Sequence, residues 1–376
     1  MTQYDECNVG LLRAEIRDFL DADRAEHGWK PRCDSWLRSF DLGFSRRLAD
    51  AGWVGATWPS TYGGAERSNV ERMVVTEELL FAGAPVAAHW IADRQIGPAL
   101  LHHGSEAIKH EFLPRIIRCE IVFCVGLSEP DTGSDLAGLR TRAEPVTDGW
   151  RITGGKIWVS HAHRADFGYI LARTATGGDK HDGLTEFIID MDAEGVAVRP
   201  IIDMEGEHHF NELLLDGVFV PDERVVGTVD EGWPQITSQL AFERSGPERI
   251  LSSALVLDGL LEQAMRTGGE ILAVPAGDLV ARTWVLRQMS RQVAREMDTL
   301  GTAPAGLAAL VKLFGTKLEQ EIVEIARSHS PFEPSPGDSE PWPALVAAAS
   351  YAAPTFTLRG GANEILRGIV AKELVK

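Results

Sequence analysis

One glycine- and hydroxyl-rich stretch, VGLSEPDTGSDLAGLRTRA from Val125 to Ala143, carries the residue types best suited to ligand binding. Four small residues in it let a ligand come close to the backbone: Gly126, Gly133, Ser134 and Gly138. Backbone N–H groups can donate to such a ligand, as can the hydroxyls of Ser128, Thr132 and Ser134. The pattern predicts a loop that wraps a flat polar molecule, but it is equally typical of a turn-rich loop at the rim of a barrel.

A second stretch, GGKIWVSHAHRAD, adds an aromatic side chain that could cover a ring system. Trp158 and Ser160 are two residues apart, so in a strand they share one face. A buried core tryptophan is the alternative interpretation of Trp158.

A third stretch, LRGGANEILRG from Leu358 to Gly368, places two adjacent glycines before an apolar, helix-prone run. Gly360 and Gly361 are suited to a loop whose backbone approaches a ligand closely. No acid or nucleophile stands at the tip of this loop, so the group that does the chemistry must lie elsewhere in the chain.

Composition narrows the classes of function. The 376 residues carry a formal charge of −18, which repels phosphate backbones and anionic lipid, so we expect no nucleic-acid partner and no membrane partner. The four cysteines form no CxxC pair, which favours a reducing cytoplasm: Cys7, Cys33, Cys119 and Cys124. We see no secretory signal at the start and no apolar run of roughly 18–20 residues.

The hydrophobic pattern divides the chain into three regions. Residues 1–121 show helical spacing, residues 122–228 show short β-like runs, and residues 229–376 return to long helical patterns. The expected fold class is therefore α+β and multidomain, with an N-terminal helical domain, a middle antiparallel β-barrel or sandwich, and a C-terminal bundle of the four-helix type. Within the β region, GWRITGGKIWVSH predicts two short strands joined by a tight turn at Gly154-Gly155.

Five segments in this order resemble the acyl-CoA dehydrogenase family. WVGATWPSTYGGAE is similar to its N-terminal helical domain, LSEPDTGSDLAGLRTRA to its flavin-side signature, and WRITGGKIWVSHAHRADFGYILAR to the strands that follow. FNELLLDGVFVPDERVVG is similar to the exit from the β domain, and RGGANEILRGIVAKEL to the C-terminal loop and helix. The resemblance covers nearly the whole length of the chain.

The resemblance implies FAD bound between the β domain and the C-terminal bundle. Carried over by position, Leu127 and Ser128 would face the pyrimidine and N5 side of the flavin. Gly133 and Ser134 would lie beside the pyrophosphate or the CoA arm of the substrate.

Three more positions are implied cofactor contacts. Trp158 and Ser160 would cover the flavin and hydrogen-bond to it, and Glu364 lies where the tail of the family contacts the cofactor. The implied partners are an acyl-CoA substrate and an electron acceptor such as an electron-transferring flavoprotein.

The family removes an α-proton from an acyl thioester with a glutamate while a hydride leaves the β-carbon for flavin N5. In many members that glutamate stands three residues before the NE of the tail, which here is Gly360. Some relatives instead carry it on the first helix of the bundle, just before an arginine, and Glu248-Arg249 in AFERSGPERILSS matches that pair. We therefore expect Glu248 to be the base, Arg249 to contact substrate, and the Gly360 loop to supply room and a backbone N–H for the thioester oxygen.

Glu243, followed by Arg244, is the rival base. Five residues separate it from Glu248, so on one continuous helix the two carboxylates would point about 140° apart. A helix-capping or salt-bridging role for these acids is the remaining interpretation.

The chain departs from the family pattern in two places. An arginine before Phe-Gly and a segment with Gln and Gly-Gly normally reach the FAD of a neighbouring subunit, but here MRTGGEILAVPAGDLVAR and EQEIVEIARSHSPFEP stand instead. Either FAD is held differently or another chain supplies these contacts. This divergence resembles actinobacterial-type subunits of α2β2 heterotetramers that oxidise bulky CoA esters such as steroid side chains, so a homo- or heterotetramer with a related subunit is expected.

Other functions remain open from the sequence. The chain could be a non-catalytic or half-competent subunit, a flavin oxidase or hydroxylase, or a relative specific for carrier-protein thioesters. The histidine pairs do not complete a recognisable ligand set, so we expect no metal site and mainly surface or loop histidines.

Overall fold

The structure is a computed structural model, and it describes residues 6–244, 246–267, 270–330 and 333–375. The chain forms two compact units, each built from separated stretches of sequence. Unit 1 comprises Met1–Phe44, Arg67–Ala87 and Ala241–Lys376, and unit 2 comprises Ser45–Glu66 and Ala88–Leu240. The three domains expected from the sequence follow a different division of the chain, and their two boundaries stay a prediction.

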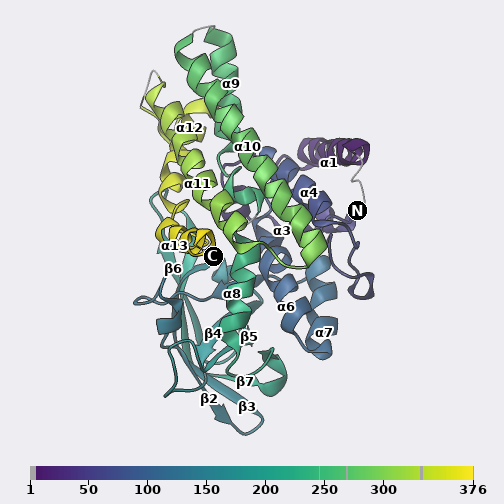
Figure 1. Cartoon of the computed structure of the whole chain (residues 1–376), viewed down its shortest axis with the longest axis vertical. Helices are drawn as coiled ribbons and strands as arrows, with labels where there is room; N and C mark the ends of the chain where they lie inside the picture. The colour runs from purple at the N-terminus through teal and green to yellow at the C-terminus, as the bar shows by residue number, and fades with distance from the viewer. Residues whose placement is uncertain (1–5, 245, 268–269, 331–332, 376) are drawn as a thin grey trace. The chain divides into compact units, whose positions relative to one another are not determined.

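Unit 1 is helical (Figure 1). Its elements are α1 (Glu6–His27), α2 (Ser35–Arg38), α4 (Asn69–Phe81), the 3-10 turn η6 (Pro247–Arg249), α9 (Ala254–Thr267), α10 (Glu270–Leu300), α11 (Ala305–Ser328), α12 (Pro341–Ala352), η7 (Ala353–Thr355) and α13 (Asn363–Leu374). The long helices α10 and α11 pack against each other, as the predicted C-terminal bundle requires (Figure 1).

Two buried acids on α4 connect three helices of unit 1. Glu77 accepts from Arg13 of α1 and from Arg287 Nε of α10 at 2.7 Å, and Glu78 accepts from Arg13 and Arg17. Burial opposes ionisation of Glu77, but the hydrogen bonds and charges of Arg287 and Arg13 outweigh it and hold its pKa below the ordinary value. Sequence-distant helices are thus joined by charge as well as by apolar packing.

Unit 2 combines helices with one sheet. Its helical elements are η1 (Ser60–Tyr62), the π-helical turn η2 (Ala92–Ile96), α6 (Gly97–His103), α7 (Glu106–Ile117), η3 (Leu136–Gly138), η4 (Ala162–Arg164) and η5 (Asp222–Arg224). Three helices cross the boundary between the units: α3 (Leu42–Asp50), α5 (Ala87–Ile91) and α8 (Gly232–Glu243).

The sheet of unit 2 contains eight strands in the described part of the chain, in the order β6-β7-β3-β2-β4-β5-β8 with β1 beside β4. The strands are β1 (Phe123–Gly126), β2 (Arg142–Val146), β3 (Gly149–Ser160), β4 (Phe167–Arg173), β5 (Leu184–Asp190), β6 (Val196–Ile202), β7 (His208–Pro221) and β8 (Val225–Val226). Most neighbours are antiparallel, but β1 and β2 pair with β4 in parallel. The predicted α–β–α fold class is confirmed, with a single mostly antiparallel sheet as its middle region.

The predicted hairpin at Gly154-Gly155 is wrong, because Gly149–Ser160 is one continuous strand. The glycines serve close packing instead: a Cβ on Gly154 would lie 2.4 Å from Thr141 Oγ1. The ladder with β7 shifts register between Ile152 and Gly154 and again before Val159, so the strand accommodates irregularities without turning back.

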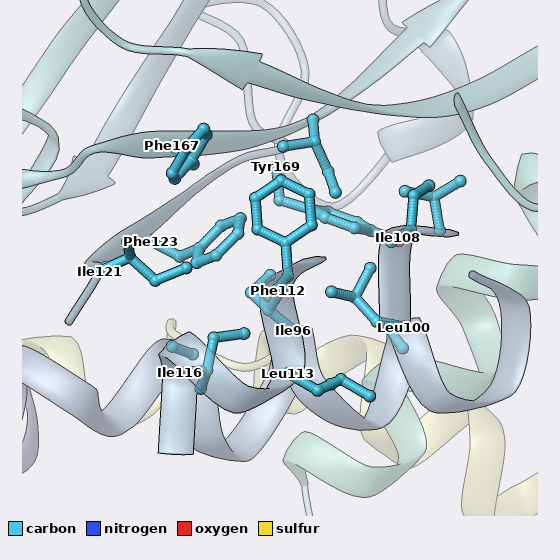
Figure 2. Packing of buried hydrophobic residues seen from close by; sticks show 14 of the residues in the cluster. Ile96, Leu100, Ile108, Phe112, Leu113, Ile116, Ile121, Phe123, Phe167 and Tyr169 are labelled. Carbon is cyan, nitrogen blue, oxygen red and sulfur yellow. The ribbon is translucent and has the colours of Figure 1, made fainter. Parts of the chain in front are cut away.

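Aromatic side chains form the centre of one core of unit 2. Phe112 of α7, Phe123 of β1 and Phe167 of β4 point toward one another (Figure 2), with ring centroids 5.1–5.6 Å apart. Gly97 extends this core, because a Cβ there would lie 1.9 Å from the Trp58 ring. The core thereby fixes α6 and α7 against the edge of the sheet from which the glycine-rich stretch departs.

The described cysteines Cys33, Cys119 and Cys124 are buried free thiols. Burial raises the pKa of each of these thiols to about 12. None of the described helices has both the length and the apolar composition of a membrane span.

A buried carboxyl group connects the sheet to α8 within unit 2. Gln239 Nε2 donates to both oxygens of Glu186 at 3.0 Å and to the Tyr169 hydroxyl at 3.2 Å. Burial raises the pKa of Glu186 from 4.5 to about 8, so the carboxyl is mainly protonated at neutral pH.

This pKa predicts a pH-dependent stability. The folded pKa of Glu186 lies above the unfolded one, so its contribution is complete below pH 4.5 and is lost as the pH rises through about 8. At about 1.4 kcal/mol per pKa unit the loss is a few kcal/mol. Urea unfolding at pH 5 and pH 9 should show a smaller pH difference for Glu186→Gln than for the unchanged protein; an identical difference would contradict the assignment. Glu319 has a similarly raised pKa, so the comparison of the two proteins is needed to isolate Glu186.

Candidate functional site

The glycine-rich loop, residues 125–143, is anchored in unit 2 by a buried lysine. Lys156 of β3 has no exposed side-chain surface, and its ammonium donates to Leu127 O at 3.2 Å and to Glu129 Oε1 at 2.9 Å. Burial lowers the pKa of Lys156 to about 8, against the stabilising charge of Glu129. The loop is therefore fixed from beneath by an ion pair rather than by apolar packing alone.

Glu129 connects the beginning of the loop to its end. Its carboxylate accepts from the backbone N–H groups of Arg140 at 2.7 Å and Thr141 at 2.9 Å, so both ends of the loop meet on one side chain. Burial opposes its ionisation, but Lys156 and these N–H groups hold its pKa below the ordinary value. The loop is thus rigid before any ligand binds.

The predicted cofactor contacts on this loop remain accessible. Leu127 and Ser128 are half-buried, whereas Gly133 and Ser134 are exposed, and a Cβ built on Gly133 would meet nothing within 4 Å. Ser128 O accepts from Ile157 N at 2.9 Å, which holds this part of the loop beside the end of β3.

Trp158 is adjacent to that contact and adopts an unusual conformation. Its φ is +60°, in the left-handed region that non-glycine residues rarely occupy, and its side chain is 56% exposed. The ring makes an edge contact with Phe210 at 5.8 Å, and Ser160 is half-buried two residues on. A core role for Trp158 is excluded, and strain with exposure at one aromatic residue is typical of a ligand-facing position.

Histidines gather next to this end of β3. His163 and His208 stack with ring centroids 3.9 Å apart, and both contact Asn211 Oδ1. The expectation of surface or loop histidines is wrong for His209, which is buried in β7, whereas His161 is buried but lies in the turn between β3 and η4. Among the described residues, no group of three or more His, Cys, Asp or Glu could hold a metal ion.

Glu248 lies in unit 1, in the turn η6, and its side chain is only 3% exposed. The prediction that it begins the first bundle helix is wrong, because α9 starts at Ala254. Ser252 marks the interruption: its N–H donates to Glu319 Oε1 at 2.6 Å instead of to a helical carbonyl, and its hydroxyl donates to Glu248 O at 2.8 Å.

The rival Glu243 ends α8, so the two acids do not share one continuous helix and the 140° argument does not apply. The side chain of Glu243 and the whole of Ser245 lie outside the described residues. Gly246 precedes the turn with an extended backbone, and a Cβ there would lie 1.9 Å from a carboxylate oxygen of Glu248.

Arg249 brings the Glu248 turn against the C-terminal loop. Gly360 has φ +64°, and a Cβ built on it would lie 2.7 Å from Arg249 Nη2. The sequence predicted room for Glu248 at this point; the three atoms nearest that space belong to the guanidinium of Arg249. Gly361 has φ +92°, with Arg244 beside it, so both glycines are required by backbone conformation as well as by space.

Trp36 of α2 links the turn and the loop, and sequence analysis missed it. The guanidinium carbons of Arg249 and Arg359 lie 5.0 and 4.6 Å from the centre of its ring, within the range of cation–π attraction. Arg359 also donates to Asp34 Oδ2 at 2.6 Å, and the Trp36 indole donates to Ser252 Oγ at 3.1 Å. These partners are far apart in sequence and carry no local motif that would reveal them.

The predicted Glu364 lies in the first turn of α13, is exposed, and has Arg367 as an ion-pair partner at 3.8 Å. Unit 1 therefore brings together Glu248, Arg249 and Gly360, and unit 2 brings together Leu127, Ser128, Trp158 and Ser160. Parts of both divergent segments, residues 268–269 and 331–332, lie outside the described residues.

The residues of unit 2 fit a flat aromatic cofactor. The exposed Trp158 indole offers a face for stacking, and the open space at Gly133 admits a ligand to the backbone. The neighbouring hydroxyls of Ser128, Ser134 and Ser160 add neutral donors in a protein whose net charge is negative.

Family models match more than half of the chain. The acyl-CoA dehydrogenase N-terminal domain matches residues 10–120, and the acyl-CoA dehydrogenase middle domain matches residues 124–218. The matches cover the helices before the sheet and most of the sheet itself.

Similar curated proteins include two acyl-CoA dehydrogenases of Mycobacterium tuberculosis. FadE29 is 32% identical, with 97% of this chain aligned to 96% of that protein. FadE34 is 36% identical over 84% of this chain, but the chain spans only 45% of the length of FadE34.

Similar solved structures include two assemblies. The Tcur3481-Tcur3483 steroid ACAD is 28% identical with a TM-score of 0.85, covering 100% of this chain and 99% of that one. The ChsE4-ChsE5 complex from Mycobacterium tuberculosis is 27% identical with a TM-score of 0.83, covering 98% and 97%.

The Lys156–Glu129 pair predicts that a single substitution lowers the free energy of unfolding more than the double substitution does. Lys156→Met leaves a buried carboxylate without its cation and should lower the free energy of unfolding by about 3–5 kcal/mol. Adding Glu129→Gln should recover part of that loss in urea unfolding. Lys180→Met is the control, because its pair with Asp135 is exposed and should contribute less than about 1 kcal/mol. Equal losses for Lys156→Met and Lys180→Met would contradict the buried-pair assignment.

The surroundings of Gly360 predict that a glycine-to-alanine substitution there changes stability very differently from one at Gly368. Gly360→Ala should destabilise the protein by at least about 1–2 kcal/mol, because it strains a left-handed backbone and displaces Arg249. Gly368→Ala, in α13 with nothing within 4 Å of the new Cβ, should be neutral or stabilising by up to about 1 kcal/mol. Thermal and urea unfolding of the two variants would measure the contrast, and equal stabilities would refute it.

Proposed function

The chain belongs to the acyl-CoA dehydrogenase family, and we propose that it catalyses the FAD-dependent α,β-dehydrogenation of an acyl-CoA thioester. The observation that carries the proposal is the contact between Arg249 and Gly360. This contact places the turn that contains Glu248 next to the loop at Gly360, where many family members carry their acid. The base and the loop can therefore act on one substrate although they belong to different segments.

Glu248 is the proposed base. Its side chain is almost fully buried, and its backbone is fixed through the Ser252 hydroxyl and through Arg249 on Trp36. A fixed carboxylate in a site that excludes water can take the α-proton of a bound thioester, provided that the developing enolate is stabilised at the same time.

The Gly360–Gly361 loop is the proposed source of that stabilisation. Within the described residues, the N–H groups of Gly360, Gly361 and Ala362 donate to no backbone or side-chain acceptor, and all three residues are only half-buried. These N–H groups can therefore donate to the carbonyl oxygen of the thioester as negative charge develops on it.

FAD, when bound, accepts the hydride that leaves the β-carbon of the substrate. Leu127, Ser128, Trp158 and Ser160 would hold its ring system, Gly133 and Ser134 would lie at its pyrophosphate or at the CoA arm, and Glu364 would contact it from α13. Arg249 would contact substrate through the guanidinium that lies beside Gly360.

A bulky CoA ester, such as one with a steroid side chain, is the proposed substrate class. The likeness to the Tcur3481-Tcur3483 steroid ACAD supports it. The likeness to the ChsE4-ChsE5 complex supports assembly with a second, related chain, and the two divergent C-terminal segments agree with FAD contacts supplied by such a partner. An electron-transferring flavoprotein is the proposed acceptor.

The second candidate is a half-competent subunit that needs its partner to bind FAD. The visible spectrum of the chain purified alone separates the two candidates. A yellow protein that bleaches anaerobically with an acyl-CoA supports a complete site, whereas a colourless protein that becomes yellow only with a related chain supports the second candidate. Oxygen consumption without another electron acceptor would instead indicate an oxidase.

The assignment of the base predicts the outcome of a paired substitution. Glu248→Gln should lower kcat by at least about a hundredfold while FAD content is retained, because the amide cannot accept the α-proton. Glu243→Gln should keep turnover within a few-fold of the unchanged protein. Full activity of Glu248→Gln would reject Glu248 as the base. So would a loss of turnover that appears in Glu243→Gln instead.

A further inference from the structure

Lys312 of α11 is wholly buried, yet it reaches the loop that carries the proposed oxyanion donors. We propose that Lys312 is the positioning residue of the Gly360–Gly361 loop: its ammonium aims the backbone N–H groups that stabilise the forming enolate, and it polarises the N–H of Ala362 through Gly361 O. This inference rests on the proposed function. It adds a residue of α11, a helix from which the sequence analysis predicted no site residue.

The ammonium binds the loop at three oxygen atoms. Lys312 Nζ donates to Gly361 O at 2.7 Å, to Asn363 Oδ1 at 3.0 Å and to Thr357 O at 3.3 Å. Thr357 O also accepts from Asn363 N at 3.1 Å, which closes the loop between these two residues. One cation thus holds the start, the tip and the end of the loop.

The neighbouring guanidinium completes the arrangement. Arg244 Nε donates to Gly360 O at 3.4 Å, so the carbonyls of both glycines point toward cations inside unit 1. In a trans peptide the C=O and N–H of one unit point in opposite directions. The units whose carbonyls belong to Gly360 and Gly361 therefore direct the N–H groups of Gly361 and Ala362 away from those cations.

The charge on Lys312 has a second effect. A hydrogen bond from an ammonium to a carbonyl polarises the peptide and makes the N–H of that unit a stronger donor. The low dielectric constant around a buried ammonium enhances this effect. Lys312 binds Gly361 O, whose peptide unit carries the N–H of Ala362, so an enolate oxygen that accepts from Ala362 N–H would be stabilised through the peptide by a charge that it does not touch.

The loop depends on this anchor because its own conformation is unfavourable. Two consecutive residues adopt left-handed φ values, +64° and +92°, and glycine loses more conformational entropy than any other residue when it is fixed. The aim of the N–H groups must therefore be maintained by contacts from outside the loop, and Lys312 makes three of them.

Acetoacetyl-CoA can test the role of Lys312 separately from hydride transfer. Its α-proton is acidic and it is not dehydrogenated, so its bound enolate is detected by a long-wavelength charge-transfer band with the oxidised flavin. The FAD-loaded protein, with any partner chain that it requires, is titrated with acetoacetyl-CoA at several pH values. Lys312→Met is compared with Lys317→Met, which removes an exposed lysine from the same helix.

The expected result is a shift in enolate formation. In Lys312→Met the band should appear only at a pH at least one unit higher, kcat should fall at least tenfold, and FAD content and the Kd of the CoA ester should change less than threefold. Lys317→Met should match the unchanged protein. Lys312→Gln retains a hydrogen-bond donor without the charge and should give an intermediate shift; it also replaces Lys312→Met if that variant does not fold.

Two outcomes would overturn the inference in different ways. A charge-transfer band in Lys312→Met or Lys312→Gln with the pH dependence of the unchanged protein would show that Lys312 does not position the donors. If the unchanged FAD-loaded protein binds acetoacetyl-CoA without forming the band at any pH, the enolate chemistry of the proposed function fails, and the role of Lys312 fails with it.

Discussion

The packing of the Arg249 guanidinium against Gly360, a residue without a side chain, is the interaction on which the arrangement around Glu248 in unit 1 depends. Because Gly360 leaves that space open, the arginine can lie inside the loop and near the ring of Trp36. Arg359 reaches the same ring and binds Asp34, so segments near residues 34, 249 and 360 are held in one cluster. A side chain at residue 360 would disturb all three segments at once.

A buried lysine anchors a glycine-containing loop in each of the two units. Lys156 in unit 2 and Lys312 in unit 1 are buried cations that each bind backbone carbonyls of a glycine-containing loop. A buried ammonium is costly unless it is well coordinated, so each lysine strongly disfavours loop conformations that withdraw those oxygens.

Sequence analysis predicted what is encoded locally. The glycine-rich loop, the double glycine before α13 and the order of helical and β regions all follow from neighbouring residues, whereas the exposure of Trp158 was left open. The hairpin at Gly154-Gly155 was wrong because glycine also serves close packing, here against Thr141. The start of the helix at Glu248 was wrong because Ser252 bonds to Glu319, 67 residues away. Lys156 and Lys312 were missed because their partners lie 27 and 49 residues distant, and no spacing rule connects them.

The discontinuous make-up of the two units has a consequence for biogenesis. Unit 2 is complete once Leu240 has been synthesised, whereas unit 1 needs residues 1–44 and 67–87 to meet the segment from Ala241 onward. Glu77 on α4 meets Arg287 only after α10 has been synthesised, and Asp34 meets Arg359 later still, because Arg359 belongs to the last 18 of the 376 residues. During translation the early helices of unit 1 therefore remain without their final partners while unit 2 folds, and their apolar faces need protection until the C-terminal helices emerge from the ribosome.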